Sequence, residues 1–194
     1  IVNVGSTAFL RYSRIMERKD GNDIGIPVSV VTDCDIKPEY NTDPVTHNEK
    51  FNAKETQSVQ KQEEKNSKYT PRWTLEYCIA LSSLSDDFHK AVHYGKKILN
   101  AQEHISLTDT KIDEANREAE AEAQAWNGVS SAERAYHIYK LMLNGDGKSS
   151  LKAITAQCLV SLLRWKISIV PDGLTQEKMF DLELYGFKTD KDKK

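Results

Sequence analysis

Apolar and polar residues alternate with helical spacing through most of the second half of the chain. The pattern predicts helices over residues 73–84, from residue 85 onward, and over 110–126, 130–144 and 150–165. Asp86 and Asp87 are suited to the positive end of the second of these helices, and Ser130 with Glu133 forms a capping box for the fourth. The last helix carries apolar side chains at core spacing, namely Leu151, Ile154, Cys158, Leu159 and Leu162.

The first part of the chain has a different pattern. Residues 1–4 and 27–32 are short apolar runs typical of strands, and a helix is predicted between them over residues 8–18. A strand, a helix and a strand with short connections indicate a parallel βαβ unit. Residues 39–70 are polar and charged, and we expect a mobile loop or a solvated helix there. Residues 167–170 are a candidate closing strand.

These elements predict an α/β fold with three regions. Residues 1–72 would form the first part of a Rossmann-type core, with a short parallel sheet flanked by helices and with 39–70 as its mobile polar segment. Residues 73–145 would be a helical insertion. Residues 146–194 would supply the closing helix of the core and a basic tail.

Asp33 and Asp35 are the first candidates for chemistry, because they directly follow the apolar run at 27–32. Ligands of parallel sheets bind at the carboxyl ends of strands, and strand alternation would place both carboxylates on one face. Two such carboxylates repel each other unless a cation lies between them, and oxygen ligands favour Mg²⁺ or Mn²⁺. The alternative is that the two aspartates cap a turn before Pro38.

Glu76 and Lys152 are further candidates. Glu76 lies in an apolar helical stretch, where a carboxylate is costly unless it is paired or bound to a metal. It could equally face solvent or pair with Arg72, four residues earlier. Lys152 opens the last helix beside the apolar stripe and could stabilise negative charge on a phosphate, or it could simply be solvated.

Two other patterns resemble known sites without completing them. Residues 145–150 end like a phosphate-binding loop, but Met142 stands where the motif needs glycine, and a helix precedes it instead of a strand. His89 and His93 have the spacing of metal ligands on a helix. No glutamate of the zinc-protease motif and no nearby cysteine accompany them, so we interpret them as a structural or surface pair.

Composition adds few constraints. The 194 residues carry 27 basic and 29 acidic side chains, so the net charge does not indicate a nucleic-acid binder. No run approaches the roughly 18 apolar residues that a membrane span needs, which predicts no membrane association. Three widely spaced cysteines indicate reduced thiols and a cytoplasmic protein. The start of the chain reads as the middle of a protein, so we expect a fragment.

Four blocks of the sequence together resemble the Toprim region of OLD-family (overcoming lysogenization defect) nucleases. They are residues 1–9 (IVNVGSTAF), 30–38 (VVTDCDIKP), 73–77 (WTLEY) and 152–157 (KAITAQ), in the family's order. The resemblance implies a Toprim core with a helical insertion, and DNA cleavage with two divalent metal ions, Mg²⁺ or Mn²⁺. It implies that Asp33, Asp35 and Glu76 bind metal, with Glu76 also catalytic, and that Lys152 is the catalytic lysine.

The resemblance also implies parts that this chain does not contain. Family members carry glutamates at the end of the first Toprim strand, and no such block precedes Ile1, so this chain alone should bind metal weakly. ATP would act only through an ATPase region upstream. The expected partners are DNA, further copies through the full-length protein, and a helicase or other defence protein, in anti-phage defence or DNA processing.

The predicted function is therefore a metal-dependent endonuclease or nickase domain. Arg11, Arg14 and Lys37 would contact the DNA backbone weakly, which would make binding salt-dependent. One alternative is a haloacid-dehalogenase-type phosphatase with Asp33 as nucleophile, although Lys37 stands where that family usually has Thr or Val. Another is a non-catalytic dimerisation or assembly module that uses Trp126, Tyr136 and Tyr139 as a partner surface.

Overall fold

The structure is a computed structural model that describes residues 33–57, 72–100, 107–143 and 148–166. It divides into two compact units, Ile1–Cys78 and Ile79–Lys194. The predicted strands at 1–4, 27–32 and 167–170, the helix at 8–18, and the side chains of Arg11 and Arg14 lie outside the described residues.

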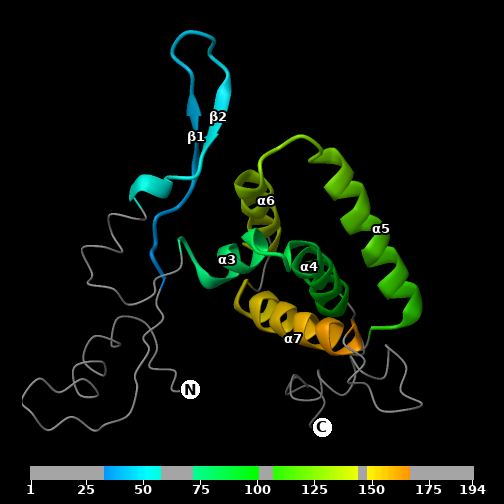
Figure 1. The fold of residues 1–194 in the computed structure, drawn as a ribbon. Helices are drawn as coiled ribbons and strands as arrows, with labels where there is room; N and C mark the ends of the chain where they lie inside the picture. Colours follow the sequence, from blue (N-terminus) through cyan, green and yellow to red (C-terminus); the bar gives the residue numbers. More distant parts are fainter. Residues whose placement is uncertain (1–32, 58–71, 101–106, 144–147, 167–194) are drawn as a thin grey trace, which may run out of the picture. The chain divides into compact units, whose positions relative to one another are not determined.

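The first unit contains a β-hairpin made of β1 (Glu39–Thr42) and β2 (Glu49–Asn52) (Figure 1). The strands are antiparallel, and Tyr40 lies opposite Phe51. The centroids of these two rings are 5.6 Å apart in an edge-to-face arrangement, the geometry in which aromatic pairs attract each other. This cross-strand pair is the main apolar contact that joins two otherwise polar strands.

Asp43 organises the turn of this hairpin. Its Oδ1 accepts hydrogen bonds from the backbone N–H of Val45 (2.8 Å) and of Thr46 (2.7 Å). These two bonds hold the pKa of the exposed Asp43 carboxyl below its ordinary value. The prediction of a loop or solvated helix from residue 39 is therefore wrong for 39–52, because the aromatic pair and the Asp43 turn make a hairpin from polar strands.

The first unit also contains the start of α3 (Leu75–Leu81), which extends across the division between the two units. Trp73 and Tyr77 are buried, and their ring centroids lie 5.6 Å apart. Burial raises the pKa of Tyr77 to about 12, so its hydroxyl stays protonated at neutral pH. These two aromatics anchor the stretch that carries Glu76.

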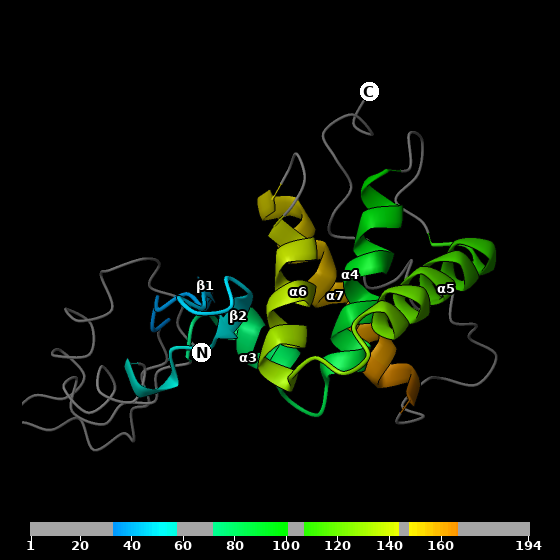
Figure 2. The ribbon, with the colours of Figure 1, turned by 90° about the horizontal axis from the view of Figure 1, so that it is seen from above.

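The second unit is helical. Its elements are α4 (Ser85–Leu99), α5 (Asp109–Ala125), α6 (Ser131–Leu143) and α7 (Lys148–Lys166). Figures 1 and 2 both show α4 between α5 and α7, and α4 packs against all three of the other helices. The boundary predicted at residue 145 falls inside this unit, since α7 packs chiefly on α4.

The predicted helices are confirmed in this unit, because their caps and apolar stripes act as the sequence indicated. Ser130 Oγ accepts a hydrogen bond from Glu133 N (3.2 Å), as in a capping box, and Asp86 and Asp87 lie in the first turn of α4. The stripe on α7 is buried at all five predicted positions, Leu151, Ile154, Cys158, Leu159 and Leu162. The helix predicted from about residue 110 begins slightly earlier, where Thr108 caps it.

The packing of α5 on α4 buries little apolar surface on the α5 side. Ile112, Ala115 and Ala119 are the buried side chains of α5, and two of them are alanines. Apolar burial stabilises by about 25 cal/mol per Å², so such small side chains contribute little. Polar contacts supplement this small apolar face, and one of them joins Tyr94 on α4 to Asn116 on α5.

Replacing Tyr94 with phenylalanine should lower the free energy of unfolding by about 1 kcal/mol. The Tyr94 hydroxyl, buried on α4, donates a hydrogen bond to Asn116 Oδ1 of α5 at 2.7 Å, and phenylalanine would leave that oxygen without this donor. Urea denaturation measures the change. In a double-mutant cycle with Asn116→Ala, strictly additive effects would contradict a direct contribution of this bond.

At the level of fold class, the described residues are mainly helical with a small antiparallel sheet. The parallel sheet was predicted from residues 1–32, which lie outside the described part. All three cysteines are free thiols, as predicted. In the part of the chain that the structure describes, no helix is long and apolar enough to cross a membrane.

Candidate functional site

Asp33 and Asp35 lie beside the start of α3, although about forty residues separate them in sequence. Asp33 Oδ1 accepts a hydrogen bond from Leu75 N (3.1 Å), the first residue of α3. Asp35 N donates to the backbone carbonyl oxygen of Trp73 (3.0 Å). The structure thus joins the two segments that carry Asp33, Asp35 and Glu76.

The local geometry of this segment differs from the prediction. Residues 33–38 are not part of a strand, and Asp35 has a left-handed backbone with φ of 59°. Exposure still alternates, because Asp33 and Asp35 are exposed while Cys34 between them is fully buried. Asp33 also caps α3, which is a structural role that needs no metal.

The remaining predicted residues lie in different places. Glu76 is half-buried in the first turn of α3, and Lys37 is exposed. Arg72, which the sequence offered as a partner for Glu76, forms an ion pair with Glu55. Lys152 lies on α7 in the second unit, half-buried, with its Nζ 5.6 Å from the ring centroid of Tyr139.

The aromatic residues that we predicted as a partner surface pack within the second unit. Tyr139 is buried beneath Lys152. Trp126 is half-buried and stacks between the rings of His89 and His137, with centroid distances of 4.9 and 5.4 Å. Their packing gives these two side chains a role inside the unit.

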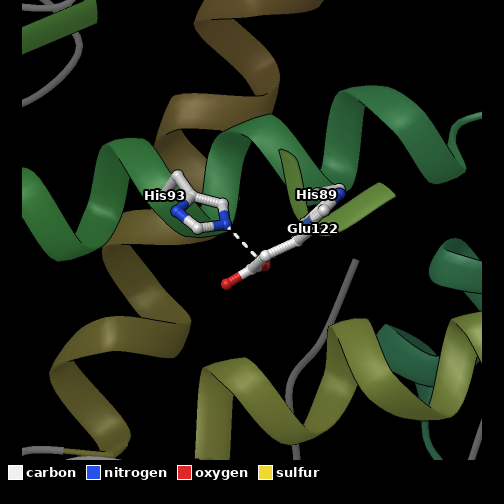
Figure 3. Close-up of side chains that lie close together, drawn as sticks. All are labelled: His89, His93 and Glu122. Atoms are coloured by element: carbon white, nitrogen blue, oxygen red, sulfur yellow. Dashed lines mark hydrogen bonds and ion pairs between the residues drawn. The ribbon is translucent and has the colours of Figure 1, made fainter. Parts of the chain in front are cut away.

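A different group of side chains has the arrangement of metal ligands. Among the described residues, the set whose ligand atoms all lie within 4.8 Å of one another is His89, His93 and Glu122. Both histidines are on α4, and Glu122 reaches them from α5 (Figure 3). His89 Nε2 and His93 Nε2 each lie 2.9 Å from the same oxygen, Oε2 of Glu122. The predicted carboxylates Asp33, Asp35 and Glu76 form no such set in the described geometry.

The cluster belongs to a longer row of polar side chains along the contact of α4 and α5. We call this row the polar seam; it comprises His89, His93 and Lys97 on α4, with Glu114, Glu118 and Glu122 on α5. Spacing by four places each trio on one face of its helix. Lys97 Nζ lies 2.6 Å from Glu118 Oε1 and 3.3 Å from Glu114 Oε2.

Burial increases along the seam toward the histidines. The side chains of His89 and His93 are 2% and 3% exposed, whereas those of Glu122 and Glu118 are 34% and 49% exposed. Burial lowers the pKa of His89 to about 4, so this ring is neutral at pH 7. Burial favours a higher pKa for Glu122, but the hydrogen bonds with His89 and His93 outweigh it and leave that pKa below its ordinary value.

The sequence contained half of this site. The spacing of His89 and His93 is visible in the sequence, where neither the glutamate of the zinc-protease motif nor a nearby cysteine accompanies them. Glu122 is 33 residues beyond His89 and on another helix, so only the packing of α5 against α4 brings it to the pair. Glu114, Glu118 and Glu122 recur every four residues in the sequence, and this spacing is a signal that could have pointed to a carboxylate face opposite the histidines.

Comparison with known proteins identifies no relative. No family model, no curated protein and no solved structure matches the chain. Interpretation of the site therefore depends on its chemistry and on the resemblance of the four sequence blocks.

Proposed function

We propose that this chain is the Toprim-type nuclease region of an OLD-family protein and hydrolyses phosphodiester bonds in DNA. One observation supports the proposal above all. The two most specific blocks of the resemblance, around Asp33–Asp35 and Glu76, are joined by hydrogen bonds at the start of α3. That contact brings together the segments that would have to share metal ions.

The donor set fits the proposed metals in kind. Asp33 and Asp35 offer exposed carboxylates, and Glu76 offers a half-buried one, which are oxygen ligands suited to Mg²⁺ or Mn²⁺. Divalent ions bound there would activate water and stabilise the leaving oxygen. Leu75 N donates to Oδ1 of Asp33, so a cation would share this carboxylate with the start of α3.

Cationic residues of the chain would act on the phosphate in this proposal. Lys152 would neutralise charge on the scissile phosphate, which requires this residue of the second unit to reach the reacting group. Lys37, exposed two residues beyond Asp35, would contact the DNA backbone. Binding should then weaken as salt rises.

Replacing Asp33 with asparagine in the full-length protein should lower metal-dependent nicking of supercoiled DNA at least tenfold. Asparagine is as good a helix cap as aspartate and can still accept the Leu75 hydrogen bond, but it removes the charge that a cation needs. Plasmid nicking in Mg²⁺ and in Mn²⁺ is the measurement, and the unfolding midpoint should stay within error of wild type.

Two further variants complete this experiment, one at a second proposed ligand and one as a control. Glu76→Gln should reduce nicking similarly, whereas Glu49→Gln, which neutralises an exposed carboxylate on β2 of the same unit, should not. If Asp33→Asn nicks DNA as fast as wild type, the capping role alone accounts for Asp33 and the nuclease proposal fails.

A further inference from the structure

We propose that His89, His93 and Glu122 bind a zinc-class divalent cation that fastens α5 to α4. The two imidazole Nε2 atoms converge on one carboxylate oxygen, each at 2.9 Å. In a tetrahedral zinc site, bonds of about 2.0–2.2 Å place neighbouring ligand atoms roughly 3.3 Å apart. All three ligand atoms lie within 4.8 Å of one another, so small side-chain adjustments would admit an ion among them.

The imidazoles are held as metal-binding histidines usually are. His93 Nδ1 lies 3.3 Å from Glu118 Oε2, and Lys97 in turn holds Glu118. A carboxylate that orients the far nitrogen of a metal-bound histidine is a recurrent feature of zinc sites. The ring of His89 is fixed differently, because it stacks on Trp126 at a centroid distance of 4.9 Å.

Hydrogen bonding within the seam also favours a cation. Both ring nitrogens of His93 face carboxylate oxygens, Nε2 that of Glu122 and Nδ1 that of Glu118. With a metal on Nε2, the remaining Nδ1–H would donate to Glu118. Glu114, Glu118 and Glu122 bring three carboxylates to the seam beside one lysine, Lys97, and a divalent ion at the histidines would add positive charge among them.

The ligand types select the metal. Two imidazole nitrogens and one carboxylate suit Zn²⁺ and its neighbours Co²⁺ and Ni²⁺, whereas Mg²⁺ prefers oxygen ligands throughout. Three protein ligands leave a fourth position, and the partial exposure of Glu122 opens that position to water. The site is thus chemically distinct from the all-carboxylate set proposed around Asp33.

The position of the site indicates what the ion would do. The buried face of α5 is small, with two alanines among its three buried residues. An ion bound to two residues of α4 and one of α5 would link the helices where apolar contact is weak. We expect the bound ion to raise the unfolding midpoint of the protein, because it binds the folded state alone.

Titration of the metal-stripped protein with Zn²⁺, followed by calorimetry, tests the proposal. Wild type should bind one ion at the seam, and Glu122→Gln should bind it at least tenfold more weakly. Glu122 is partly exposed, so this variant should fold even where a change at the buried His93 does not. His47→Gln, a change of an exposed histidine in the hairpin of the first unit, should keep wild-type affinity.

Co²⁺ provides the second readout. Its absorption should show a tetrahedral ion with nitrogen and oxygen ligands and no thiolate charge transfer, and the band should disappear in Glu122→Gln. Burial raises the pKa of the Cys158 thiol, which makes it a poor ligand, so a thiolate band is not expected.

Three results would overturn the proposal: no uptake of Zn²⁺ or Co²⁺ by wild type, uptake unaffected by Glu122→Gln, or a thiolate band. The two proposals have separate readouts, since Zn²⁺ binding is tested by Glu122→Gln and DNA nicking by Asp33→Asn. This separates the proposal from the nuclease site, because either one can fail without the other.

Discussion

Lowering the pH from about 7 to about 4 should destabilise the metal-free second unit by about 3 kcal/mol through His89 alone. Burial lowers the pKa of His89 in the folded protein from 6.5 to about 4. Between these two values the unfolded chain binds a proton that the folded chain excludes. Stability therefore falls as the pH drops through this window, and it is fully present above pH 6.5.

The carboxylates of the seam act in the same direction at lower pH. Lys97 holds the pKa of Glu118 below its ordinary value, and the two histidines do so for Glu122. Their contribution to stability is present above the ordinary carboxyl pKa and is lost as the pH falls through the folded values. As the pH falls, stability should thus be lost first through His89 and then, at lower pH, through the glutamates.

His89→Gln isolates the part that belongs to the histidine. Glutamine can still donate a hydrogen bond to Glu122 but does not titrate, so the loss of stability between about pH 6.5 and 4 should shrink by most of the 3 kcal/mol. Urea denaturation at a series of pH values, with a chelator present, measures the slope. A slope in His89→Gln as steep as that of wild type would show that His89 is not the titrating group.

Helix positions were predictable because their determinants are local. The stripe of Leu151, Ile154 and Cys158 on α7 and the Ser130 cap of α6 act within a few residues of sequence, and both are confirmed. The hairpin was missed because its strands, EYNT and EKFN, contain one aromatic residue each. The pairing of Tyr40 with Phe51 becomes visible only when the Asp43 turn sets the register.

The candidate sites show the same limit. Sequence identified Asp33 by the apolar run before it, but could not reveal that its carboxylate caps a helix that begins at Leu75. It identified His89 and His93 by their spacing, but could not supply Glu122. In both cases the missing partner lies on an element whose position depends on tertiary packing. A spacing pattern in the sequence identifies the residues on one face of a helix. Which residues of another element pack against that face depends on the tertiary structure.

Replacing Gly95 with leucine should lower the free energy of unfolding by at least about 3 kcal/mol. The reason is the close approach of α4 to α7 at this residue. A Cβ atom at Gly95 would lie 2.9 Å from Leu151 Cδ1, 3.1 Å from Thr155 Oγ1 and 3.5 Å from Thr155 N. The first neighbour is the end of a flexible side chain, but the last is backbone. A leucine side chain would therefore have to push the two helices apart.

Gly95→Ala should have a much smaller effect, because two terms oppose each other. Alanine favours a helix interior over glycine by about 1 kcal/mol, while the new methyl group must displace Leu151 Cδ1 and press on Thr155. We expect a net change within about 1 kcal/mol of zero. Urea denaturation of the alanine and leucine variants side by side tests whether space, and not backbone conformation, sets the limit at this position.

A compensating substitution decides whether crowding is the cause. Leu151→Ala removes the nearest atoms, so in the Gly95→Leu background it should restore part of the lost stability, although in wild type it should cost about 2–5 kcal/mol as a core truncation. Coupling of this sign is the signature of two side chains that compete for one volume. Additive losses in the double variant would contradict the close approach of α4 and α7 at Gly95.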